Sequence, residues 1–360
     1  MSEAKSREIE SLIGEAITNH CFPGIVVLVS KRGRVVFSHH SGSRQLHPET
    51  EVMAADTIFD LAEMTQPLAT ALLSVLIMNA EKIGLGERLG RFMPDLCEES
   101  RDLTLGQLLL HTGGLPADVE LAKEFPDSKS IDYGRAVRVL LAVKPTQAPG
   151  SRVLFSQAGY LLLGQFLRRV TGVRLQELFA QLVAAPCALA DTFFNPPVVL
   201  WGRVAATARC PWRKRWIRGQ VYDSNSYCLG GEGGNAGLFS TGPSVMKLMS
   251  AFGADGVVNG HRLLSTSQTR LMRTCLTANL GMRRSLAFLL QGENSPVGPS
   301  YSEVSFGQIG ANGTSVWMEP SSELTIVVLS NAIHLEDERQ RVQFADFNTQ
   351  LYTLIHRHWG

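Results

Sequence analysis

Two short sequence patterns contain residue types that could perform hydrolysis. Ser244 and Lys247 form a Ser-x-x-Lys pair. Residues three apart share one face of a helix, so the lysine amine could accept the serine proton and generate a nucleophile. The second pattern, His111-Thr112-Gly113-Gly114, combines an imidazole, a hydroxyl and two glycines. Whether either pattern forms a site depends on the helices and strands that contain it.

Metal and cofactor chemistry find no support in the sequence. No two of the six cysteines form a CxxC pair, and none has a histidine at zinc-finger spacing. His39 and His40 have no third ligand nearby. We therefore expect free, buried thiols, no metal and no cofactor.

Charge and hydropathy narrow the class of protein. Lys plus Arg number 34 and Asp plus Glu 33, a net charge of +1, which argues against nucleic-acid binding by bulk charge. The cationic and aromatic stretch Trp212–Trp216 is interpreted as a loop that packs its tryptophans and points its charges to water. No apolar run reaches membrane-spanning length, and residues 1–10 lack a signal pattern, so we expect no membrane contact and a cytoplasmic protein.

Hydrophobic periodicity predicts strands near both ends of the chain. Residues 24–30 and 35–39 form an expected hairpin, and residues 313–319 and 324–330 are two further apolar strands. Helical spacing predicts helices at residues 7–19, 68–80, 103–110, 160–170 and 336–356. The simplest architecture is an antiparallel sheet formed from both termini, with a mainly helical domain inserted.

Several segments, in a fixed order, carry a resemblance to a known family. They are DTIFDLAEMTQPLATALLSVLIMNAEKIGLGERLGRFMPD (56–95), LTLGQLLLHTGGLP (103–116), PGSRVLFSQAGYLLLGQFLRRVTG (149–172), GNAGLFST (234–241) and SFGQIGANGTSVWMEPSSELTIVVLSN (305–331). Together they resemble the serine β-lactamase and penicillin-binding-protein-like hydrolases, in the branch nearest class C β-lactamases.

The resemblance implies an α/β fold of the α+β type. It consists of a β-lactamase/transpeptidase-like antiparallel sheet flanked by helices, with an inserted all-helical domain. We expect residues 1–60 and 210–360 to form the sheet domain and residues 61–209 the helical domain. An active-site-like cleft would lie between them.

The first catalytic motif of the family is a Ser-x-x-Lys at the start of a buried helix. The matching residues are Glu63 and Gln66, so both the serine nucleophile and the lysine base are replaced. The literal pair Ser244 and Lys247 lies outside this context, and we interpret it as a chance match on a surface helix.

The second and third motifs also depart from the family. Tyr-x-Asn is replaced by Phe155-Ser156-Gln157, which removes the phenol that would transfer a proton to the leaving group. Lys/His-Thr/Ser-Gly is replaced by Gln308-Ile309-Gly310. All three motifs are degenerate while their flanks are intact, so acyl-enzyme chemistry is not expected. His111-Thr112-Gly113-Gly114 precedes the second motif and is interpreted as a structural turn.

Backbone groups of the cleft do not depend on these side chains. By resemblance, the oxyanion hole consists of the N–H groups of Glu63 and Ala311, and Ile309, Gly310 and Ala311 would line the ligand site. The Glu63 side chain could instead fill that space itself, its charge favoured by a helix N-terminus.

Three functions remain open. The leading hypothesis is a pseudoenzyme whose cleft binds an acyl, peptide-like or carboxylate ligand. The second is an enzyme of altered chemistry that uses Glu63 as acid, base or nucleophile on an amide or ester-like substrate. The third is a structural or regulatory subunit whose cleft is closed by hydrogen bonds among Glu63, Gln66 and Gln308. A protein partner or a homo-oligomer stays undetermined.

Overall fold

A seven-stranded antiparallel sheet forms one half of the computed structural model, which describes residues 2–253, 255–293, 295–335 and 338–360. In spatial order the strands are β11 (Leu289–Leu290), β12 (Phe306–Gly310), β13 (Thr314–Glu319), β14 (Leu324–Ser330), β1 (Gly24–Lys31), β2 (Arg34–Gln45) and β3 (Glu51–Val52). Strands from opposite ends of the chain pair directly, with Val27 of β1 opposite Val328 of β14. The fold is the expected mixed α/β type, an antiparallel sheet flanked by helices.

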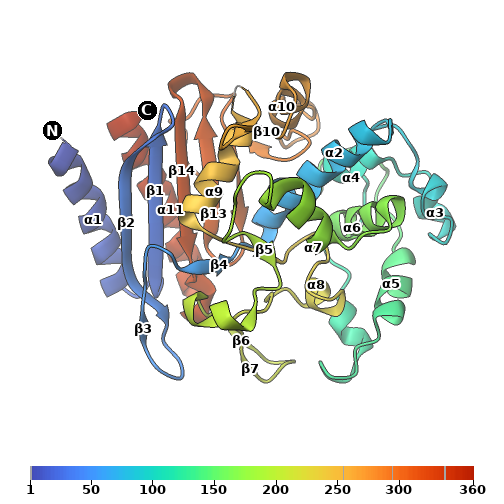
Figure 1. Cartoon of the computed structure of the whole chain (residues 1–360), viewed down its shortest axis with the longest axis horizontal. Coiled ribbons are helices and arrows are strands. Elements are labelled where there is room, and N and C mark those ends of the chain that lie inside the picture. The colour runs from blue at the N-terminus through green and yellow to red at the C-terminus, as the bar shows by residue number, and fades with distance from the viewer. Residues whose placement is uncertain (1, 254, 294, 336–337) are drawn as a thin grey trace.

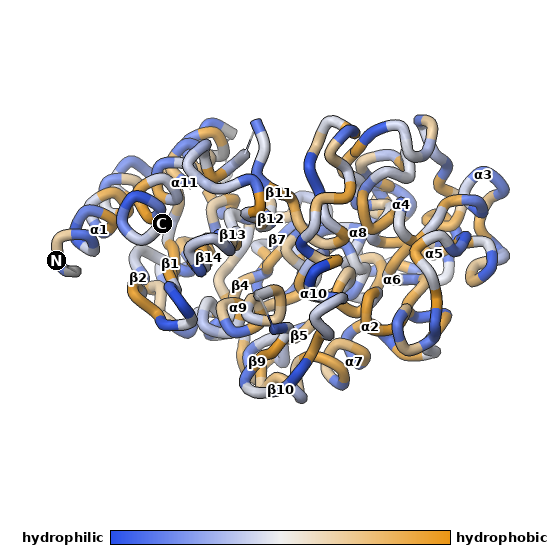
Figure 2. Tube along the Cα trace, turned by 90° about the horizontal axis from the view of Figure 1, so that it is seen from above, coloured by the Kyte–Doolittle hydropathy of each residue, from blue (hydrophilic) through white to orange (hydrophobic). Residues whose placement is uncertain are grey.

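Helices cover both faces of this sheet (Figures 1 and 2). On one face lie α1 (Ser2–Thr18) and α11 (Glu338–Trp359), and on the other lies α9 (Gly242–Met249). Alternate residues of β1 point to opposite faces, so Val27 joins the core beneath α1 and α11, whereas Val26 joins the core beneath α9. Because both faces are covered, β1 is apolar almost throughout.

The middle of the chain is mainly helical and lies beside the sheet (Figure 1). Its helices are α2 (Leu72–Ala80), α3 (Glu98–Arg101), α4 (Leu105–Leu109), α5 (Tyr133–Leu141), α6 (Gln157–Thr171) and α7 (Leu175–Phe179). Helix α6 begins after the cap Ser156, whose hydroxyl accepts the Gly159 N–H, and ends at Gly172 in a left-handed conformation. None of the described helices is long and apolar enough to cross a membrane.

Short elements connect the two halves. They are β4 (Ile58–Asp60), β5 (Phe193–Phe194), β6 (Arg209–Cys210), β7 (Arg215–Trp216), α8 (Ser224–Cys228), β8 (Leu238–Thr241), β9 (Val257–Val258), β10 (His261–Arg262) and α10 (Thr266–Arg273). The strands β4, β8 and β5 form a small sheet of their own. This sheet matters for function because β4 leads directly into the first-motif segment.

Several local predictions are confirmed. The hairpin of β1 and β2 turns at Arg32 and Gly33, which both have positive φ. All six cysteines are free as expected, but only Cys187, Cys210 and Cys228 are buried, and Cys21, Cys97 and Cys275 are partly exposed. The expected buried helix at residues 68–80 exists, but its first part is a π-helix over Gln66–Ala71 before α2 begins. The predicted helix 336–356 corresponds to α11, although residues 336 and 337 lie outside the described residues.

One interpretation of the charged residues is wrong. Arg213 does not point to water, because its side chain is buried and donates hydrogen bonds to the carbonyls of Val221 and Tyr222. Helix α9 packs on the main sheet by the face that carries the buried Ser244, and Lys247 is exposed on its outer face.

Candidate functional site

The first-motif residue Glu63 is held on a tight turn after β4. The preceding Ala62 has φ +47°, an unusual value for a residue with a side chain, and its N–H donates to Asp60 Oδ1 at 3.0 Å. On the other side, a Cβ atom at Gly310 of β12 would lie 2.7 Å from the Leu61 carbonyl oxygen. Glycine at position 310 therefore lets β12 approach this turn and brings the first and third motif segments together.

The Glu63 carboxylate occupies the backbone donors that the resemblance assigns to the oxyanion hole. The Ala311 N–H donates to Glu63 Oε2 at 2.7 Å, and the Glu63 N–H also bonds to this carboxylate. Gln157 Nε2 donates to Glu63 Oε1 at 3.4 Å. Residues from all three motif segments thus meet at one carboxylate.

Burial dominates the electrostatics of this carboxylate. It raises the pKa of Glu63, and the negative charges of Asp223 and Asp60 raise it further, whereas the N–H donors of Ala311 and of Glu63 itself lower it. A helix N-terminus would lower the pKa of Glu63, but the pKa is raised. The reason is that the cost of desolvating the charged carboxylate exceeds the stabilisation of that charge by the two N–H groups. The protonated form is therefore favoured relative to a free glutamic acid.

Two further carboxyl groups, those of Asp60 and Asp223, line the same cavity as Glu63. Burial raises the pKa of Asp60 to about 6, although Asp60 also accepts the N–H groups of Tyr222 and Ala62. Burial also raises the pKa of Asp223, whose carboxylate accepts hydrogen bonds from the Ser226 N–H and the Asn235 amide. Groups whose environments disfavour ionisation are common at functional sites.

A relay of amides connects these acids. Asn235 Nδ2 donates to Gln157 Oε1 at 2.6 Å and to Asp223 Oδ1 at 3.0 Å. Gln157 in turn donates to Glu63. The relay fixes the orientation of the Gln157 amide and joins the start of α6 to the segment before β8.

These groups line a cavity of about 460 Å³. Its lining residues are Asp60, Ala62, Glu63, Ala122, Gln157, Cys210, Pro211, Trp212, Tyr222, Asp223, Ser224, Ala236, Ala311 and Asn312. This lining contains three acids and no Lys, Arg or His among the described residues. The structure therefore differs from a closed cleft, and the cavity is acidic.

The other predicted site residues lie around this cavity without lining it. Gln66 is fully buried, and neither polar atom of its side chain has a hydrogen-bond partner. Phe155 stacks on His111, with ring centroids 4.7 Å apart. Gln308 is buried on β12, and Ile309 lines an adjoining cavity of about 360 Å³ next to α11, which shares Tyr222, Ala311 and Asn312 with the acidic cavity. The predicted mutual hydrogen bonds of Glu63, Gln66 and Gln308 are absent among the described residues.

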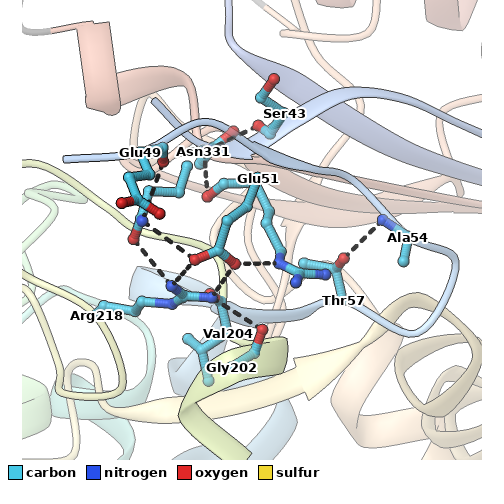
Figure 3. A network of polar contacts seen from close by, with 11 residues as sticks. Ser43, Glu49, Glu51, Ala54, Thr57, Gly202, Val204, Arg218 and Asn331 are labelled. Carbon is cyan, nitrogen blue, oxygen red and sulfur yellow. Dashed lines mark hydrogen bonds and ion pairs between the residues drawn. The ribbon is translucent and has the colours of Figure 1, made fainter. Parts of the chain in front are cut away.

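A partly exposed ion-pair network fixes the segment that carries the cavity-lining residues Trp212 and Asp223 (Figure 3). Arg218 belongs to the same irregular segment as Trp212 and Asp223, and it donates to both oxygens of Glu51, at 2.6 and 2.7 Å. Arg44 donates to the same carboxylate at 2.9 Å. The two arginines lower the pKa of Glu51 to about 2. This network ties that segment to β2 and β3 of the main sheet.

Sequence reasoning missed several residues of the site. Asp60, Tyr222, Asp223 and Asn235 all contribute contacts or lining. Asp60 and Asn235 lie inside two of the segments that carry the family resemblance, but their roles depend on contacts between distant segments. No pattern in the sequence marks Asp223 as a partner of Asn235.

The arrangement can bind a polar ligand and can exchange a proton at Glu63. It contains no Ser or Lys at the first-motif positions, so it cannot form a serine acyl-enzyme there. Among the described residues, no group of three or more His, Cys, Asp or Glu could hold a metal ion.

Comparisons with known proteins agree with this geometry. The family described as Beta-lactamase matches residues 9–349. An Escherichia coli K12 protein named "Putative D-alanyl-D-alanine carboxypeptidase" is 26% identical, covering 87% of this chain and 79% of the relative. An N-acetylmuramyl-L-alanine amidase of Bacillus subtilis is 26% identical, covering 92% and 82%. A class C beta lactamase from Rhodobacter sphaeroides has a TM-score of 0.72 at 18% identity, covering 96% of this chain and 99% of that chain, which supports the shared fold.

Proposed function

The chain belongs to the beta-lactamase family, and from this premise we propose that it is a pseudoenzyme that uses the family cleft to bind a peptide-like ligand. The observation that best supports this proposal is the hydrogen bond from the Ala311 N–H to the Glu63 carboxylate at 2.7 Å. The carboxylate thereby engages a donor that the resemblance assigns to the oxyanion hole. A substrate carbonyl would have to displace a bound carboxylate, and no serine would then attack it. Binding is therefore the retained function, without turnover.

The charge of the cavity suggests which ligand it prefers. Three carboxyl groups line it, two of which are flanked by an amide relay, and the Trp212 ring forms part of the same wall. A free carboxylate would meet like charges there, whereas an amide or an ammonium group would find acceptors. We expect a neutral or cationic peptide-like ligand in place of a carboxylate ligand.

The names of the relatives supply probes. One relative is named for D-alanyl-D-alanine and another for N-acetylmuramyl-L-alanine. We would titrate the full chain with D-alanyl-D-alanine, its C-terminal amide and N-acetylmuramyl-L-alanine, and follow binding calorimetrically. The proposal predicts that the amide binds more tightly than the free acid. Asp223→Asn should reduce this preference, whereas Asp102→Asn on the distant surface should not.

Turnover experiments complete this test. A chromogenic cephalosporin and a short-chain nitrophenyl ester should not be hydrolysed above the rate with heat-denatured protein. Hydrolysis that disappears in Glu63→Ala would overturn the pseudoenzyme proposal. If none of the three probes binds and none is hydrolysed, the ligand class that we propose is wrong.

A second candidate function has one observation in its favour. Burial raises the pKa of Glu63, which makes its carboxylate a stronger base than a free glutamate. Glu63 could then act as general base on an amide or ester-like substrate. This alternative predicts hydrolysis with a rate that rises through the pKa of Glu63 and is lost in Glu63→Gln. A rate independent of pH in this range would exclude it.

A further inference from the structure

A buried cation without a counter-charge lies outside the acidic cavity. Arg284, in the segment between α10 and β11, is 2% exposed, and its Nε and Nη2 atoms have no hydrogen-bond partner. Among the residues that the structure describes, no carboxylate forms an ion pair with it. A guanidinium remains protonated in proteins. Burial of an unpaired charge is strongly unfavourable, so this group requires an explanation.

His111 contributes a second unpaired donor. Its ring is buried, and its Nδ1 accepts the Ser156 N–H at 3.1 Å. Burial lowers the pKa of His111 well below its usual value, so the ring is neutral and its hydrogen lies on Nε2. This Nε2 atom has no partner. The unpaired atoms of His111 and Arg284 are therefore all donors.

The two side chains belong to one packed region. The His111 ring stacks on Tyr160 with centroids 4.9 Å apart, and the Tyr160 hydroxyl donates to the Leu109 carbonyl at 3.2 Å and lies 3.5 Å from the Leu286 carbonyl, two residues beyond Arg284. The segments are also joined through Val153, whose N–H donates to the Leu280 carbonyl. Burial is the main cause that lowers the pKa of His111 and raises the pKa of Tyr160, and the positive charge of Arg284 acts on both groups, as expected of near neighbours.

We propose that a small monatomic anion of the chloride class binds between Arg284 and His111. Three donor atoms, two of them on the fixed positive charge of Arg284, match an anion, whereas a water molecule would accept hydrogen bonds without neutralising the guanidinium. Phe155, two positions before the relay residue Gln157, stacks directly on the His111 ring. Bound chloride would therefore stabilise the wall that carries the second-motif segment.

Thermal unfolding of the full chain tests this site. Sodium chloride or bromide would replace sodium gluconate at constant ionic strength. Above Kd, Tm should rise with the logarithm of the halide concentration, by roughly 2–4 °C in total at a hundred times Kd. Arg284→Met should abolish the halide dependence. Arg283→Met is the matched control, because the neighbouring Arg283 has the carboxylate partner Glu303, and its halide dependence should equal that of the unmodified chain.

Two results would overturn the proposal. One is a Tm of the unmodified chain that is the same in halide and gluconate. The other is a halide dependence that persists in Arg284→Met. If that variant does not fold, crystals of the unmodified chain grown in bromide decide the question. An anomalous peak within hydrogen-bond distance of Arg284 and His111 supports the site, and a map without one refutes it.

Discussion

The Glu51–Arg218 pair gives a stability prediction that can be worked from the structure. A fall in the pKa of Glu51 from its ordinary 4.5 to about 2 corresponds to roughly 3 kcal/mol, at 1.36 kcal/mol for each tenfold change in proton affinity. The Glu51 side chain is 30% exposed, so solvent screening reduces the expected value to about 2 kcal/mol. We predict that Glu51→Gln lowers the free energy of unfolding by about 2 kcal/mol at pH 7.

The pH dependence has a definite sign. Because the folded pKa of Glu51 is lower than its unfolded pKa, the stabilisation is present above about pH 4.5 and is lost as pH falls towards 2. The difference between the unmodified chain and Glu51→Gln should therefore narrow by about 1 kcal/mol between pH 7 and pH 4.

Urea unfolding followed by tryptophan fluorescence measures both quantities. The control is Asp102→Asn, which removes an exposed ion pair with Arg88 and should cause no measurable change. The double variant Glu51→Gln/Arg218→Met should be less destabilised than the sum of the single variants, because the two residues share one interaction. A loss below about 0.5 kcal/mol at pH 7, or a loss that does not change with pH, would refute the reasoning.

Three further predictions concern the site. Gly310→Ala should destabilise the chain by about 1–3 kcal/mol in urea unfolding, because the new Cβ would lie 2.7 Å from the Leu61 carbonyl oxygen; Gly84→Ala, with no atom within 4 Å, should be nearly neutral. Burial raises the pKa of Asp60 to about 6, above the 3.8 of an unfolded aspartate, so stability should fall by about 2 kcal/mol as pH rises from about 4 to about 6; a difference curve against Asp60→Asn that is flat over this range would contradict it. The triple variant Glu63→Ser/Gln66→Lys/Phe155→Tyr should become labelled by a serine-directed probe, measured by mass spectrometry, whereas Glu63→Ser alone, lacking the base, should not.

Much of the fold could be predicted from local patterns. The apolar strands at the two ends of the chain, the hairpin at Arg32 and Gly33, and the cap at Gly172 follow from side-chain periodicity and from backbone conformations that few residues adopt. The π-helix at Gln66–Ala71 was not predictable, because it depends on how that segment packs between the sheet and α6.

The candidate site likewise depends in part on residue identity and in part on tertiary contacts. The sequence by itself determined that Glu63 and Gln66 stand at the positions where the resemblance leads one to expect serine and lysine, because residue identity at one position needs no contact to define it. The tertiary structure decided that the Glu63 carboxylate accepts the Ala311 N–H and that Asp60 and Asp223 line the same cavity. The physical reason is that desolvation and hydrogen bonding depend on which distant segments meet, and Gly310 is what allows the segment before Glu63 and strand β12 to come so close.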